Sequence, residues 1–265
     1  MEGCATLVDW DEVRPSDSAA YRRACEIMTN EANAVAQGAF ESGAPRVIVN
    51  DSHSMMRNLM TERLDPRVHV VSGTAKPNFM LEGLSGECAA AFFIGYHGAI
   101  GERDAVMPHS YSPRVIHECR LNGAPAGEVT INAALAGHLG VPVALVSGDA
   151  TTLDEVARVL PKALRVETKR SIGASAAECK SPAVVCDELR SAAGRALRSI
   201  EAFERLSLEV PIVMEIDTVS TAHADAIEAG ELFERVAPRT IRHRAADALL
   251  MYRALMNAIR LGVAA

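Results

Sequence analysis

Three histidines lie in loops beside apolar segments that are typical of buried strands. His53 lies in Asn-Asp-Ser-His-Ser after one segment, His97 lies in Gly-Tyr-His-Gly after a second, and His109 lies in Met-Pro-His-Ser before a third. A single loop histidine is more often an ordinary surface residue, although imidazole is also a common metal ligand. Reactive groups of α/β sheets gather in the loops at the carboxyl ends of the strands. Three histidines in such loops therefore indicate a shared metal site.

Two glutamates have settings that would complete such a site. Glu2 lies in Met-Glu-Gly, and Glu128 follows a glycine in the first turn of an apolar helical segment. A carboxylate can hold a zinc ion beside imidazoles, or bridge two ions. The alternative for Glu128 is a charge that complements a helix N-terminus, and the alternative for Glu2 is a plain terminal residue. The remaining histidines have no such companions and are interpreted as structural or surface residues: His69, His117, His138, His223 and His243.

The elements that must position these residues alternate between helices and strands along the whole chain. Helices are predicted over residues 16–42, 127–140, 151–160, 181–203, 222–230 and 245–261. Strands are predicted over residues 46–50, 89–95, 114–123, 141–149, 163–168 and 209–216. This order predicts an α/β fold with a mixed, mostly parallel central sheet flanked by helices, and with a smaller C-terminal α/β portion. We expect a metal-binding α/β core over residues 1–150 and a second α/β portion over residues 151–265, which could be continuous with the first.

Composition argues against several classes of protein. The 265 residues include 27 Lys and Arg and 34 Asp and Glu, which gives a net charge of −7, opposite to that of nucleic-acid proteins and of proteins that bind anionic membranes. No apolar run approaches the roughly 18–20 residues of a membrane span, and no secretory signal pattern is present. The six cysteines form no C-x-x-C pair and are expected to be reduced thiols. We therefore expect a cytoplasmic protein with neither nucleic acid nor membrane as a partner.

Five short motifs, taken together, resemble the zinc-dependent D-aminopeptidases encoded with bacterial dipeptide-transport systems. They are M-E-G at 1–3, N-D-S-H-S at 50–54, G-Y-H at 95–97, M-P-H-S at 107–110, and G-E at 127–128 with N-A at 132–133. Each motif alone is weak, but five in order at matching separations are specific. The triplets S-G-D at 147–149 and K-S-P at 180–182 also match family positions. The resemblance covers nearly the whole chain and is strongest over residues 1–182.

The resemblance implies a role for each candidate residue. Glu2 and His97 would hold one zinc ion, His53 and Glu128 would hold the other, and His109 matches the catalytic histidine of the family. The implied function is a metallo-aminopeptidase that uses two Zn²⁺ per subunit to release N-terminal D-amino acids from short peptides of the D-Ala-D-Ala type. The implied partners are a small D-peptide substrate and further copies of the chain, because family members form rings of ten subunits around an interior channel.

The sequence departs from the family pattern at its start. The pattern has an aspartate two positions before its glutamate, at the end of a strand, where it bridges both metals. Because the glutamate here is Glu2, we expect either that the sequence starts at an internal methionine of a slightly longer natural protein, or that it is a short form with one or no tightly held metal. Two other functions stay open: a metal-dependent amidohydrolase of another small substrate, and a non-catalytic, ring-forming peptide-binding homologue that lacks the bridging aspartate.

Overall fold

The computed structural model describes residues 1–265, and helices and strands alternate along it. The α-helices are α1 (Trp10–Val13), α2 (Ala19–Glu41), α3 (Glu128–His138), α4 (Ala150–Val159), α5 (Pro182–Arg198), α6 (Thr221–Glu228) and α7 (Ala248–Val263). The strands are β1 (Ile48–Asn50), β2 (His69–Val71), β3 (Ala91–Tyr96), β4 (Ile116–Leu121), β5 (Ala124–Pro125), β6 (Val143–Asp149), β7 (Leu164–Gly173), β8 (Ala176–Cys179), β9 (Ile212–Thr218), β10 (Glu234–Ala237) and β11 (Thr240–Ala245). Short 3₁₀ turns lie at Thr61–Arg63, Phe79–Leu81 and Ile200–Ala202.

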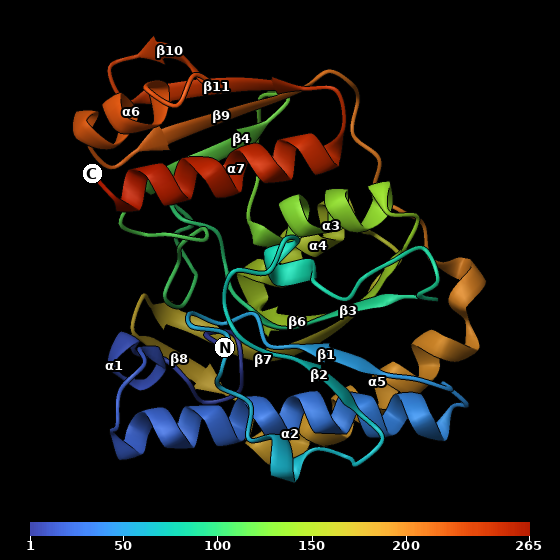
Figure 1. Cartoon of the computed structure of the whole chain (residues 1–265). Helices are drawn as coiled ribbons and strands as arrows, with labels where there is room; N and C mark the ends of the chain where they lie inside the picture. Colours follow the sequence, from blue (N-terminus) through green and yellow to red (C-terminus); the bar gives the residue numbers. More distant parts are fainter.

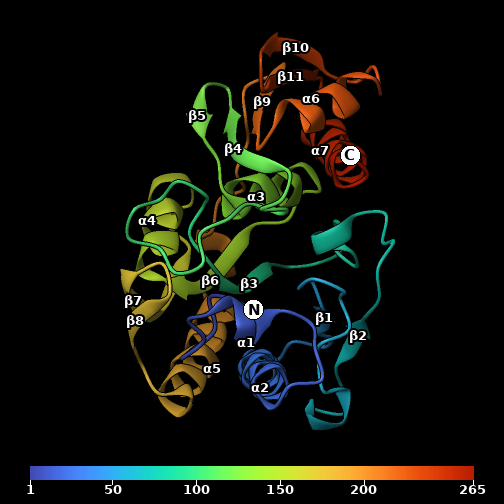
Figure 2. The same ribbon diagram turned by 90° about the vertical axis from the view of Figure 1, so that its left-hand side faces the viewer.

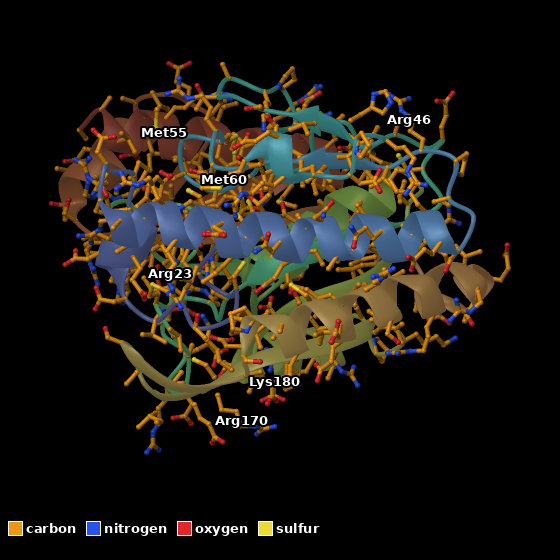
Figure 3. The ribbon with its side chains drawn as sticks, turned by 90° about the horizontal axis from the view of Figure 1, so that it is seen from below. Arg23, Arg46, Met55, Met60, Arg170 and Lys180 are labelled. Atoms are coloured by element: carbon orange, nitrogen blue, oxygen red, sulfur yellow. The ribbon has the colours of Figure 1, made fainter.

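A four-stranded sheet with the order β3-β6-β7-β8 forms the centre of the lower part of the molecule (Figure 1). Strands β3, β6 and β7 are parallel, and β8 joins the edge in the antiparallel direction. Helices α2 and α5 cover one face and run side by side, while α3 and α4 cover the other face (Figures 1 and 3). Every residue of β6 is buried, as is typical of a parallel strand that is covered on both faces. The small parallel pair β1-β2 lies beside this sheet (Figure 2).

A second, antiparallel sheet with the order β10-β11-β9-β4-β5 forms the upper part (Figures 1 and 2). Helices α6 and α7 pack on one of its faces. Buried and half-buried residues alternate along β9, which is the pattern of a sheet with one face packed on the core and one face toward solvent. On the face toward solvent, Arg120 donates to the carboxylates of Glu215 and Asp217. The packed face of this sheet shares one large hydrophobic core with α3 and β6.

The expected α/β class is confirmed, but the strands form three sheets rather than one central sheet. The boundary expected at residue 150 does not divide the strands into separate sheets, because β6 pairs with β7 and β4 pairs with β9 across it. Each large sheet therefore joins strands from the two expected portions. The predicted strand ranges do not include β2, β5, β8, β10 or β11, and the short α1 was not predicted. None of the helices is long and apolar enough to span a membrane.

The N-terminal segment, residues 1–8, forms neither helix nor strand and lies beside the carboxyl end of β3 and the middle of β7 (Figure 1). The amide of Gly3 donates to the carbonyl of Gly95 over 3.0 Å. A Cβ atom on Gly3 would come within 1.6 Å of the carbonyl oxygen of Tyr96, so this close approach requires glycine. The approach brings Glu2 next to the end of β3.

Candidate metal centre

The structure brings all five predicted site residues together, from five separate segments of the chain. Glu2 lies on the N-terminal segment, His53 follows β1, His97 follows β3, His109 lies in the loop before β4, and Glu128 begins α3. The Nδ1 atom of His53 lies 3.3 Å from Oε2 of Glu2, and Nε2 of His109 lies 3.8 Å from Oε1 of Glu2. Nε2 of His97 lies 3.6 Å from Oε1 of Glu128. The rings of His97 and His109 stack with centroids 3.8 Å apart, which joins the two groups.

Each imidazole of the centre has one nitrogen at hydrogen-bond distance from a backbone carbonyl. The pairs are His53 Nε2 with Val13 at 2.7 Å, His97 Nδ1 with Gly98 at 3.1 Å, and His109 Nδ1 with Met107 at 2.9 Å. In a neutral ring the nitrogen at the carbonyl carries the proton, so the other nitrogen is a free electron-pair donor. In all three rings that free nitrogen faces Glu2 or Glu128. Histidines that bind metals are held in this way by their second nitrogen.

The side-chain contacts group these residues differently from the ligand pairs that the family resemblance implies. Possible ligand atoms of His97, His109 and Glu128 lie within 4.8 Å of one another. Glu2 contacts His53 and His109 rather than His97. Two carboxylates and three imidazoles form a donor set that suits zinc. Which residues hold which ion, and whether His109 stands apart as the catalytic group, stay predictions.

Electrostatics favours the ligand-ready forms of two of these groups. Burial alone would raise the pKa of Glu2, but His53, the α-amino group of Met1 and His109 outweigh it and hold that pKa well below its usual value. Burial, together with the neighbouring His97, lowers the pKa of His109. Near neutral pH the carboxylate is therefore ionised and the imidazole of His109 is neutral.

The loop that carries His53 is organised by Asp51 rather than by the histidine itself. The Asp51 carboxylate accepts from the amide of Leu59 over 2.8 Å and from the side chain of Asn58 over 2.8 Å. The same Asn58 amide group donates to the carbonyl of His53 over 2.6 Å. The loop needs this support because Ser54 and Met56 adopt positive φ angles, which are unfavourable for residues other than glycine.

Lys76 is a buried residue that the sequence reasoning missed. Its Nζ donates to the side chain of Asn50 over 2.6 Å, to the carbonyl of Asp51 over 2.7 Å and to the carbonyl of Val71 over 3.3 Å. The Asn50 amide group in turn donates to the carbonyl of Met80 over 2.7 Å. The first two residues of the Asn-Asp-Ser-His-Ser motif thus anchor the loop. The residues on either side of Lys76 in the chain are exposed, so nothing in the local sequence marked this lysine as buried.

Asp149, in the Ser-Gly-Asp triplet, holds the loop that carries His109. Its Oδ1 accepts from the amide of Thr152 over 2.8 Å and so caps α4. Its Oδ2 accepts from the amide of Val106 over 3.0 Å, three residues before His109. The rings of Trp10 and His109 meet in an edge-on arrangement, with centroids 5.0 Å apart. The ring of His109 therefore contacts both Trp10 and the stacked imidazole.

The surroundings of Glu128 distinguish between its two interpretations, a metal ligand and a charge that complements the N-terminus of its helix. The N-terminus of α3 is satisfied by Glu155 from α4, whose Oε1 accepts from the amide of Gly127 over 2.9 Å. Oε1 of Glu128 instead accepts from the amide of Tyr111 over 2.7 Å and faces His97. Glu128 is thus not needed to cap its own helix, and its carboxylate belongs to the centre.

Three comparisons with known proteins each match nearly the whole chain. The sequence model of peptidase family M55, described as D-aminopeptidase, matches residues 1–257. The D-aminopeptidase of Bacillus subtilis is 35% identical over 257 residues, which cover 97% of this chain and 93% of that protein. The structure of the Zn-dependent D-aminopeptidase DppA from Bacillus subtilis, described as a self-compartmentalizing protease, matches with a TM-score of 0.94 at 33% identity, covering 100% of this chain and 96% of that chain. The family expected from the motifs is confirmed: this chain belongs to the D-aminopeptidase family, M55.

Proposed function

We propose that the protein is a dinuclear zinc aminopeptidase that releases N-terminal D-amino acids from short peptides. The observation that carries the proposal is the set of three imidazoles whose free nitrogens face two buried carboxylates in one centre. Glu2, His53, His97 and Glu128 would hold the two zinc ions. The similar Bacillus subtilis protein is described as Zn-dependent, which supports this choice of metal.

Zinc bound by these residues would polarise the scissile carbonyl and make the attacking water more acidic. His109 is proposed as the catalytic residue, because its Nδ1 is tied to the carbonyl of Met107 and its Nε2 is left free on the side of Glu2. That nitrogen would accept a proton from the attacking water and deliver it to the leaving amine. A free α-amine near a metal ion or a carboxylate of the centre would fix the N-terminus of the substrate.

The proposed substrate is a small D-peptide of the D-Ala-D-Ala type, and the proposed assembly is a cytoplasmic homo-oligomer, a ring of ten subunits. The description of the similar structure as self-compartmentalizing supports such an assembly. Ile172, in the β7–β8 hairpin, is 78% exposed and is proposed as a contact with a neighbouring subunit. Sedimentation at about ten times the 28.3 kDa of one chain is the expected result.

Metal analysis and a substrate panel test the proposed activity. Two zinc ions per chain are expected after reconstitution, and Glu128→Gln is expected to reduce that number. The panel contains D-Ala-D-Ala, L-Ala-L-Ala and D-Ala amide, with the unmetallated protein as the control. Preferential cleavage of D-Ala-D-Ala supports the proposal. Equal or faster cleavage of the L-peptide contradicts D-selectivity, and cleavage of the amide alone indicates an amidohydrolase of another substrate.

A further inference from the structure

We propose that Lys169 is a positioning residue for the metal centre, because its ammonium group holds the backbone of the segment that carries Glu2. The inference rests on the proposed function, in which Glu2 is a zinc ligand. Lys169 lies on β7, is 1% exposed, and donates from Nζ to the backbone carbonyls of Glu2, Cys4 and Leu7. An ammonium group has three N–H donors, so these carbonyls use all of them.

The N-terminal segment forms neither helix nor strand, so its backbone depends on side chains such as that of Lys169 for hydrogen bonds. The hydroxyl of Thr168, next to Lys169, donates to the carbonyl of Gly3 over 2.6 Å. On the other side, Oε1 of Glu31 on α2 accepts from the amide of Ala5 over 2.7 Å. Buried backbone groups need partners, and here most partners are side chains from distant strands and helices. These side chains therefore determine where the segment lies relative to the other ligands.

The positive charge of Lys169 is buried without a counter-ion, because no carboxylate lies within salt-bridge distance of it. A buried ammonium without a counter-ion is unfavourable, and an apolar side chain of similar length would avoid the desolvation. By contrast, Lys180 pairs with Glu188 over 2.8 Å on the outside of the molecule (Figure 3). What Lys169 provides that methionine cannot is the convergence of three carbonyls on one point, which folds the segment around it.

The test measures zinc affinity directly, by competition with a chromophoric chelator, and records the visible absorption of the Co²⁺-substituted protein. Lys169→Met is expected to lower zinc affinity about 10- to 100-fold, the usual effect of losing a group that orients a metal ligand. It is also expected to change the Co²⁺ spectrum. Lys180→Met is the matched surface control and is expected to change neither.

A second pair of variants covers the case in which Lys169→Met does not fold. Thr168→Val keeps the shape of the side chain but removes the hydroxyl, and it is expected to weaken zinc binding. Thr168→Ser keeps the hydroxyl and is expected to restore the affinity. Ile241→Ala, in the buried face of β11, controls for a general loss of stability and is expected to bind zinc normally.

The outcomes separate the two levels of the argument. If Glu2→Gln weakens zinc binding while Lys169→Met and Thr168→Val leave affinity and spectrum unchanged, the positioning role is wrong and the ligand set stands. If Glu2→Gln itself leaves zinc binding unchanged, the proposed ligand set is wrong and the inference falls with it. Weakening by all three variants, with normal binding by Lys180→Met and Ile241→Ala, supports the inference.

Discussion

Residues of one sequence motif take different parts in the centre. In Asn-Asp-Ser-His-Ser, only His53 faces the ligand cluster, through its contact with Glu2. Asn50 and Asp51 bind backbone and the buried ammonium of Lys76, and they hold the loop in shape. A motif of five residues therefore contributes one candidate ligand and two positioning side chains. The residue types alone could not show this division, because aspartate is also a common metal ligand.

His109→Ala is expected to reduce kcat by about 10²- to 10⁴-fold while both zinc ions stay bound, because the proposed role of this imidazole is proton transfer. The measurement is kcat and KM on D-Ala-D-Ala together with the metal content of the same sample. His97→Ala is the matched comparison, since its ring stacks on that of His109 and it is a proposed ligand. Loss of zinc from His109→Ala would show that His109 is a ligand instead.

At the scale of elements, the sequence predicted best those elements whose ends carry their own signals. Helix α2 was expected over residues 16–42 and occupies Ala19–Glu41, because Ser18 caps it and a glycine with a positive φ angle follows it. Strand β11 was missed because only Ile241 and Ala245 are buried in it, so its sequence shows no regular apolar alternation. Arg242 lies opposite β9 and pairs with the carboxylate of Glu215 there.

In the candidate site, too, the sequence predicted only what local signals indicate. Its three histidines and two carboxylates were found from residue type and loop position. The residues that hold them were not, because a contact such as that of Lys169 with the segment of Glu2 joins positions far apart in the chain. Nothing in the local sequence of β7 indicates which segment its lysine meets.

The packing of α2 against α5 yields a prediction about glycine. A Cβ atom on Gly38 would lie 2.1 Å from the backbone carbonyl oxygen of Arg190. A Cβ atom on Gly194 would lie closest to side-chain atoms of Ser42 and Arg198, and its nearest backbone neighbour, the carbonyl oxygen of Gly38, would be at an ordinary contact distance of 3.6 Å. Alanine is normally the better helix former by about 1 kcal/mol. Gly38→Ala is nevertheless expected to lower the free energy of unfolding by about 1–3 kcal/mol, because backbone cannot move aside as a side chain can.

Gly194→Ala, on the facing helix, is the matched control and is expected to stay within about 1 kcal/mol of the wild type. Urea denaturation of the metal-free proteins measures both changes. Equal stability of the two variants would contradict the view that the helices meet backbone to backbone at Gly38.

At the scale of the whole molecule, the centre exists only when the fold is complete. Its five candidate residues come from the chain start, from the ends of β1 and β3, from the loop before β4 and from the start of α3. The N-terminal segment is held against α2 by Glu31, whose side chain is fully buried and whose second oxygen has no hydrogen-bond partner. A buried carboxylate of this kind makes the stability of the entire fold depend on pH.

Burial raises the pKa of Glu31 to about 7, even though the amide of Ala5, Cys4 and Lys169 favour its ionised form. In the unfolded chain the same group titrates near 4.3. Between these values the folded protein keeps a proton that the unfolded chain has lost, so the contribution of Glu31 to stability falls as pH rises. Above about pH 7 Glu31 is ionised in both states, and its contribution no longer changes.

Glu31→Gln removes this titration and keeps an oxygen that can accept from Ala5. The free energy of unfolding of the wild type minus that of Glu31→Gln is therefore expected to fall by about 2–3 kcal/mol between pH 5 and pH 7, and to stay level from pH 7 to pH 8. Urea denaturation of metal-free protein at each pH measures the difference. Glu41→Gln is the control: its carboxylate is exposed, and hydrogen bonding to Arg190 lowers its pKa, so its contribution changes only at more acidic pH. A level difference for Glu31→Gln from pH 5 to pH 7 would mean that Glu31 is already ionised in the folded protein. The amide of Ala5 would then donate to a buried carboxylate rather than to a neutral acid.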